Sequence, residues 1–133
     1  MKKIVVVAAV IQHEEKILCV QRSSSKYDYI SFKYEFPGGK VENNETPEQA
    51  IVREIQEELA MQVIVDSHLM TVDYDYPDFS ISLNTFLCFS GDKNLQLLEH
   101  IDYQWLFVHQ LNNLDWAAAD LPIVEKLQKN DFK

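Results

Sequence analysis

The chain is poor in basic residues, and this deficit limits its partners. Its 133 residues carry 12 Lys and Arg against 21 Asp and Glu, for a formal net charge of -9. A protein that binds a nucleic-acid polymer needs a basic surface to meet the phosphate backbone. The charge balance therefore argues against such a partner. It leaves room for a small polyphosphate, because metal ions can bring that anion to an acidic site.

The chain also has few cysteines and no long apolar run. The two cysteines, Cys19 and Cys88, each lie in an apolar stretch, so we expect buried, reduced thiols in a cytoplasmic protein. No segment approaches the roughly 18 uninterrupted apolar residues of a membrane-spanning helix, so no membrane partner is expected. The apolar run at 3–11 continues into charged sequence, which predicts a strand rather than a signal peptide.

Length and pattern predict one domain with a mixed sheet. A chain of 133 residues with 47% hydrophobic residues is typical of a single globular domain, which we assign to residues 1–133. Strands are expected at 3–11, 16–22, 34–36, 61–66, 68–76, 80–90 and 103–108. Helices are expected at 47–59 and 118–129, with a helical turn at 109–114. Because strands and helices do not alternate regularly, the predicted class is α+β, with helices layered around a mixed sheet.

Two further segments carry specific expectations. The polar, irregular stretch at 23–33 is a candidate flexible loop over a site. In the C-terminal helix, Leu121, Val124 and Leu127 recur at helical spacing and are expected to face the core.

The strongest local signal is a helix start at Thr46, Pro47 and Gln49. It combines a hydroxyl N-cap, proline at the first helical position and the third member of a capping box. We expect this helix to end near Leu59. At about 100° per residue, its apolar stripe contains Ile51, Val52, Ile55 and Leu59.

Three carboxylates, those of Glu54, Glu57 and Glu58, share an adjacent face of this helix. Such a cluster repels itself by a few tenths of a kcal/mol per pair. No lysine is interleaved, and only Arg53 lies close, at i, i+4 from Glu57. A hard cation would remove the repulsion, since Mg²⁺ is usually held by a few carboxylates plus substrate phosphates. The simpler alternative is an acidic face exposed to solvent.

The surrounding stretch favours the metal site, because it matches a known motif. The Nudix box, G-x5-E-x7-R-E-U-x-E-E-x-G-U with U apolar, is matched at Gly39, Glu45, Arg53, Glu54, Ile55, Glu57, Glu58 and Met61. One position departs from it, since Ala60 replaces glycine. Glycine would allow a left-handed helix exit at no steric cost. We therefore expect Ala60 to be either not left-handed or slightly strained, with the chemistry intact.

Beyond the box, the chain resembles MutT-type Nudix hydrolases over nearly its whole length. The resemblance includes Glu35–Lys40, Tyr74–Asp78 and Ala119–Pro122. It implies an α/β/α sandwich around a mixed sheet, with a catalytic loop-helix-loop. It also implies Mg²⁺-dependent hydrolysis, with Mn²⁺ as an alternative, of a nucleoside triphosphate to the monophosphate and pyrophosphate. The expected partner is this small nucleotide, and the expected state is a monomer or weak dimer.

The resemblance also implies a catalytic and metal-binding set. The implied metal ligands are the Gly38 carbonyl and the carboxylates of Glu54, Glu57, Glu58 and Glu99. Arg53 is expected to orient the carboxylates through its planar fork, and Glu45 to have a structural role near the loop. Glu54 is the first candidate for the base that deprotonates water, and Glu99 is the second. For Glu99, an exposed loop acid is an equally good alternative.

A second implied set binds the substrate. It contains Arg22, Phe36, Lys40, Tyr76, Phe79 and Asp120. Arg22 and Lys40 match phosphate-contacting positions, and the aromatics lie near the expected pocket walls, although one or two could be core residues.

Asp120 is the candidate for reading the base. An ionised aspartate only accepts hydrogen bonds, which suits the amine of cytosine or the N7–H of 8-oxoguanine, whereas a buried, protonated one could also donate. A helix N-cap is the alternative for Asp120.

These features together predict an enzyme of nucleotide-pool sanitation that acts on 8-oxo-dGTP or (d)CTP. Two alternatives stay open. One is a Nudix hydrolase of another nucleoside diphosphate-linked substrate. The other is a non-catalytic nucleotide-binding Nudix domain, against which the intact Arg53, Glu54, Glu57 and Glu58 argue.

Overall fold

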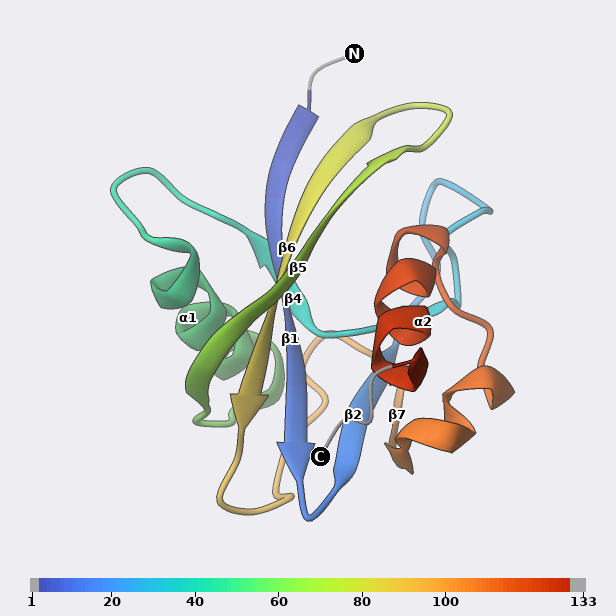
Figure 1. Cartoon of the computed structure of the whole chain (residues 1–133). Helices are drawn as coiled ribbons and strands as arrows, with labels where there is room; N and C mark the ends of the chain where they lie inside the picture. The colour runs from blue at the N-terminus through green and yellow to red at the C-terminus, as the bar shows by residue number, and fades with distance from the viewer. Residues whose placement is uncertain (1–2, 130–133) are drawn as a thin grey trace.

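A mixed seven-stranded sheet lies between two helical layers (Figure 1). The computed structural model describes residues 3–129. Its strands are β1 (Lys3–His13), β2 (Lys16–Gln21), β3 (Tyr34–Glu35), β4 (Gly38–Lys40), β5 (Ile64–Asp75), β6 (Ser80–Phe89) and β7 (Asp102–Phe107). The helices are α1 (Pro47–Leu59) and α2 (Leu121–Lys129), with 3-10 turns at Val108–Asn113 and Ala118–Asp120. No helix of this described range is both long and apolar enough to cross a membrane.

Strand β1 is central, as the apolar run predicted. The strand order is β3-β2-β1-β6-β5, with β4 paired to β1 and β7 paired to β2. β1 and β6 are parallel over their length, from the pair Lys3 and Ser80 to the pair Gln12 and Phe89. The other strand pairs are antiparallel. The predicted hairpins β1–β2 and β5–β6 are both confirmed.

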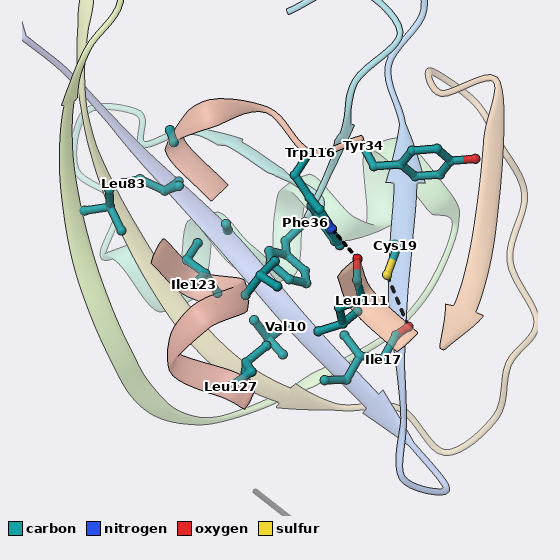
Figure 2. Close-up of a cluster of buried hydrophobic side chains, with 14 of the residues drawn as sticks. Val10, Ile17, Cys19, Tyr34, Phe36, Leu83, Leu111, Trp116, Ile123 and Leu127 are labelled. Atoms are coloured by element: carbon teal, nitrogen blue, oxygen red, sulfur yellow. Dashed lines mark hydrogen bonds between the residues drawn. The ribbon is translucent and has the colours of Figure 1, made fainter. Parts of the chain in front are cut away.

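Each face of the sheet buries its own core, which explains the uninterrupted apolar run of β1. Val7, Ala9 and Ile11 pack in the core under α1. The alternate residues Ala8 and Val10 pack in the core under α2. Figure 2 shows the second core, where Val10 lies near Ile123 and Leu127 of α2. The expected α/β/α sandwich of class α+β is therefore confirmed.

Three expectations about the elements are wrong. The strands expected at 61–66 and 68–76 are one strand, β5, which two irregularities bend against β6. A bulge inserts a residue without ending the strand. It interrupts the apolar alternation along the sequence, which therefore predicted two strands. Val52, placed on the apolar stripe, and Leu121, expected to face the core, are each 46% exposed. Ile123, on the inner face of α2, is fully buried.

Both cysteines are free and buried, as expected. Cys19 lies in the core under α2, and Cys88 in the core under α1. Burial raises the pKa of the Cys88 thiol to about 12, which keeps it in the unreactive thiol form.

Candidate active site

Helix α1 begins and ends where its local sequence predicts. The Thr46 hydroxyl accepts from the Gln49 amide at 3.1 Å, and the Gln49 side chain accepts from the Thr46 amide at 2.9 Å. The helix ends at Leu59, and Ala60 follows with φ 53° and ψ 38°, in the left-handed region. Of the two expected alternatives for Ala60, the structure has the left-handed one, which strains a residue with a Cβ.

Arg53 holds the motif together through all its guanidinium nitrogens. It donates to both oxygens of Glu45, at 2.7 and 3.0 Å, and to the Lys40 carbonyl at 2.9 Å. Its Nη1 also donates to Glu54 at 3.0 Å and to Glu57 at 3.1 Å. This two-pronged pairing lowers the pKa of the Glu45 carboxyl. Arg53 thus ties the loop before α1 to the carboxylate face of the helix.

The two glycines of the loop are required by close packing, and neither has a positive φ. A Cβ on Gly39 would lie 2.5 Å from the Glu54 carboxyl carbon. A Cβ on Gly38 would lie 1.9 Å from the Val7 carbonyl oxygen of the neighbouring β1. Gly39 therefore lets the Glu54 carboxylate rest against the loop, and Gly38 lets β4 pair with β1.

Glu58 is unusual for a charged residue, because it is only 4% exposed. Its Oε1 is buried and has no hydrogen-bond partner among the described residues. Burial, followed by contact with the Glu54 carboxylate and the charges of Glu35 and Glu99, raises the pKa of Glu58 to about 10. A buried carboxylate without a counter-charge is costly, and a divalent cation would supply that charge.

The donor set therefore fits a hard divalent cation, which binds through oxygen ligands. Within residues 3–129 no three His, Cys, Asp or Glu side chains converge as a metal group. Of the predicted ligands, Glu57 is half-exposed and pairs with Arg53 at 3.1 Å.

Two adjoining cavities lie beside these carboxylates. The smaller, of about 310 Å³, is lined by Arg22, Glu35, Glu54, Glu58, Glu99 and His100, among others. The larger, of about 560 Å³, is lined by all six predicted substrate-binding residues, Arg22, Phe36, Lys40, Tyr76, Phe79 and Asp120. Arg22, Glu35, Gly38 and Gly39 line both. An acidic cavity thus adjoins a mainly apolar one, whose lining includes several aromatic rings. Arg53 and Glu57 line neither.

Asp120 does not cap a helix, so that alternative is wrong. Its Oδ2 accepts from the Phe36 backbone amide at 2.8 Å, 84 residues away along the chain. The residue is 6% exposed. Burial, reinforced by the charge of Glu35, raises the pKa of Asp120 well above its usual value. The neighbouring Ala119 amide donates to the Tyr76 hydroxyl at 3.0 Å, which fixes this corner of the cavity.

The aromatic residues at the larger cavity belong partly to the core and partly to the cavity wall. Phe36 packs against Trp116 at 4.7 Å between ring centres, in the core shown in Figure 2, and also lines the cavity. Tyr76 contacts Phe79 at 5.1 Å. The irregular stretch at 23–33 adds Tyr27, which lines the cavity and lies 5.5 Å from Phe79. This loop therefore borders the site, as expected.

Sequence reasoning missed several residues of the cavities, among them Glu35, Tyr27 and His100. Glu35 lies just before the two glycines. Because side chains alternate along a strand, the pattern of β3 could have indicated that Glu35 faces the side opposite to Tyr34. His100 directly follows Glu99, but no local pattern distinguishes it from a surface histidine.

Comparisons with known proteins agree with this geometry. The family model for the NUDIX domain matches residues 1–127. The chain is 33% identical to the 8-oxo-dGTP diphosphatase of Escherichia coli K12 over 97% of this chain and 99% of that protein. It is 34% identical to the CTP pyrophosphohydrolase of the same organism over 94% and 91%.

Solved structures agree as well. The solution structure of the E. coli ORF135 protein has a TM-score of 0.81 at 33% identity, covering 97% of this chain and 91% of that one. The MutT protein of methicillin-resistant Staphylococcus aureus 252 has a TM-score of 0.74 at 40% identity, covering 96% and 97%. Nudix hydrolases generally use a divalent metal, which suits the buried carboxylates. The chain therefore belongs to the Nudix family, and it is a pyrophosphohydrolase of the MutT type.

Proposed function

We propose that the protein hydrolyses nucleoside 5'-triphosphates to the monophosphate and pyrophosphate, with 8-oxo-dGTP or (d)CTP and its modified forms as substrates. The observation that carries this proposal is the pair of adjoining cavities, one lined by carboxylates and the other by aromatics with Asp120. A triphosphate with its metal suits the first, and a base suits the second. The names of the two E. coli relatives support the same two substrate classes.

The proposed metal is Mg²⁺, with Mn²⁺ as an alternative. The residues proposed to hold it are the Gly38 carbonyl, Glu54, Glu57, Glu58 and Glu99. When bound, such a metal stabilises charge on phosphoryl oxygens and lowers the pKa of water. Glu58 already lies buried against Glu54. Glu57 must leave Arg53 to join them, and its exposure leaves it free to turn.

The side chains have separate roles in this proposal. Glu54, held between Arg53 and Gly39, takes a proton from the attacking water, with Glu99 as the alternative base. Arg53 keeps the carboxylates in place. Arg22 and Lys40 bind phosphate oxygens, since phosphoryl transfer needs mostly positioning and charge stabilisation. Phe36, Tyr76 and Phe79 enclose the base.

Asp120 accounts for the choice of base. Its Oδ2 is occupied by the Phe36 amide, and its raised pKa favours the neutral acid, which both donates and accepts. Cytosine offers an amine beside an acceptor, and 8-oxoguanine offers N7–H beside O6. Unmodified guanine presents two acceptors at N7 and O6, so it offers Asp120 no donor in place of the cytosine amine or the N7–H of 8-oxoguanine.

A nucleotide panel tests the proposal. The panel contains 8-oxo-dGTP, dGTP, CTP, dCTP and ADP-ribose with Mg²⁺, and release of the nucleoside monophosphate, the product common to all five, is measured together with pyrophosphate. We expect release from 8-oxo-dGTP or the cytidine nucleotides and little from dGTP. Cleavage of ADP-ribose alone would assign the protein to other nucleoside diphosphate-linked substrates. Nucleotide binding without turnover would make it a non-catalytic domain.

Glu54→Gln is the matched test of the site. It keeps the shape of the side chain but removes the base, so kcat should fall by about 10²-fold or more. Glu48→Gln, an exposed position in the first turn of the same helix, is the control and should keep normal activity. An active Glu54→Gln enzyme would refute this assignment.

We also propose that the protein acts in the cytoplasm as a monomer or weak dimer on free nucleotides rather than on a nucleic-acid polymer. The net charge of -9 supports free nucleotides over a nucleic-acid polymer, and the two buried free thiols support the cytoplasm. Sedimentation and binding to single-stranded DNA would test it.

A further inference from the structure

His100 is a buried histidine at the wall of the carboxylate cavity. Its side chain is only 6% exposed. Its Nε2 lies 3.0 Å from Glu35 Oε2 and 4.0 Å from Glu58 Oε1. It belongs to the segment between β6 and β7, far along the chain from the helix that carries Glu58. Tertiary folding therefore places His100 between Glu35 and Glu58, and Glu58 is one of the proposed metal ligands.

Glu35 extends this contact to the junction of the two cavities, since it lines both. Its other oxygen, Oε1, accepts from Arg22 Nη1 at 3.4 Å. Arg22 also lines both cavities. A hydrogen-bonded series thus runs from His100 through Glu35 to Arg22. It lies at the boundary between the proposed phosphate cavity and the proposed base cavity.

Stability alone does not account for a histidine here. The Nδ1 of His100 is buried and has no hydrogen-bond partner among residues 3–129. A buried polar group without a partner costs about 1–3 kcal/mol, and an apolar side chain of similar size would avoid that cost. Among the described residues, the ring has a hydrogen-bond partner only at Nε2, which is Glu35. We therefore look for the role of His100 in its hydrogen bond to Glu35.

We propose that His100 is a positioning residue for the nucleotide. Its Nε2–H donates to Glu35 and so fixes the Glu35 carboxylate, and through it Arg22, at the junction. The role needs the Nε2–H tautomer and no change of charge. The inference rests on the proposed function, because it gives Arg22 a nucleotide phosphate to meet. Its consequence is that loss of the Nε2 donor weakens nucleotide binding while the fold is kept.

The test compares side chains that place a nitrogen at different points of the ring. In His100→Gln the amide nitrogen reaches toward the Nε2 position, whereas in His100→Asn it reaches only toward Nδ1. His100→Leu has no donor. CMP and 8-oxo-dGMP binding is measured by calorimetry without metal, and KM and kcat are measured with Mg²⁺. We expect Leu and Asn to raise Kd and KM about tenfold, or about 1.4 kcal/mol, and Gln to stay within about threefold.

Two controls separate positioning from structure. His13→Leu removes another largely buried histidine, which contacts the Ser90 carbonyl at 2.9 Å and lies outside both cavities. It should leave nucleotide binding unchanged. In a Glu35→Gln background, His100→Leu should have little further effect, because residues that act through one another are not additive.

Several results would overturn the inference. Three of these are normal binding in His100→Leu, no rescue by His100→Gln, and additive effects of His100→Leu and Glu35→Gln. A fourth is a defect seen only as a higher Mg²⁺ requirement, which would mean that His100 acts on Glu58 instead of Glu35. Failure of the wild-type protein to bind either monophosphate would overturn it as well. If the protein binds a monophosphate but cleaves no triphosphate, the proposed function fails while calorimetry still decides the role of His100.

Discussion

Glu45 and Glu58 belong to one motif but have opposite pKa shifts. Glu45 receives two hydrogen bonds from Arg53, which lower its pKa. Glu58 is buried beside other carboxylates, which raises its pKa to about 10. An opposite charge favours the ionised form, whereas burial and like charges disfavour it. Glu45 is therefore a stable ion-pair partner, and Glu58 needs a cation to ionise.

Asp120 should make the stability of the protein depend on pH. Its native pKa is raised above the usual value of 3.8, so its contribution to stability is complete below that pH and is lost as the pH rises toward the native pKa. Asparagine does not titrate and still accepts from Phe36. We expect Asp120→Asn to be stabilised relative to wild type, by an amount that grows between about pH 4 and pH 8.

Urea unfolding across this pH range measures the effect. Asp28→Asn, at an exposed position, is the control and should show no such growth. A difference between Asp120→Asn and wild type that is the same at every pH would contradict the assigned shift.

At the scale of elements, the end of α1 has a removable strain. Ala60 has φ 53°, a conformation that costs an L-residue about 1 kcal/mol or more and costs glycine nothing. Ala60→Gly restores the consensus of the motif. Allowing for the greater freedom of glycine in the unfolded chain, the variant should gain about 0.5–1 kcal/mol in thermal or urea unfolding.

Gln56→Gly is the matched control, because it places glycine at an exposed position inside the same helix. It should lose about 1 kcal/mol. Destabilisation by Ala60→Gly would show that the left-handed exit is not strained. Activity should be unchanged, since the exit lies beyond the carboxylates.

The loop at 23–33 is fastened to the β5–β6 turn by one side-chain bond. The Tyr29 hydroxyl donates to Asp78 Oδ2 at 2.7 Å, and the Tyr29 ring stacks on Tyr76 at 5.5 Å. Tyr29→Phe keeps the ring and removes the hydrogen bond to the carboxylate. We expect faster amide hydrogen exchange in residues 23–33, by about tenfold, and a higher KM.

Tyr103→Phe, at an exposed position on β7, is the control for the loss of a tyrosine hydroxyl. It should leave exchange in the loop unchanged. Equal exchange in Tyr29→Phe and wild type would mean that ring stacking alone holds the loop.

The whole molecule is acidic, so divalent metal should stabilise it in two ways. Any salt screens the net charge of -9. Mg²⁺ should add a specific gain, of about 2.7 kcal/mol at a concentration 100 times its Kd, because it pairs the buried carboxylates. Thermal unfolding in MgCl₂ is compared with NaCl at equal ionic strength. Glu58→Gln should lose the specific part, and an equal effect of the two salts would contradict the metal site.

The elements of the fold that were correctly predicted have local causes. The bounds of α1 follow from Thr46, Pro47 and Gln49, which satisfy the helix terminus by themselves. The prediction fails where the neighbours decide. Val52 falls at the edge of the apolar stripe but faces solvent, and Leu121 faces solvent because Ile123 takes the buried position of α2. Helical spacing alone does not say where the core begins.

The sequence by itself determined the family, the reaction class and the carboxylate face, because these depend on residues at short, fixed spacing along one helix. Only the tertiary structure decided what surrounds them. It buried Glu58, joined Asp120 to the Phe36 amide and placed His100 beside Glu35. These contacts link segments 65 and 84 residues apart. Strand pairing in the sheet brings such distant segments together, and no local sequence pattern shows which of them will be in contact.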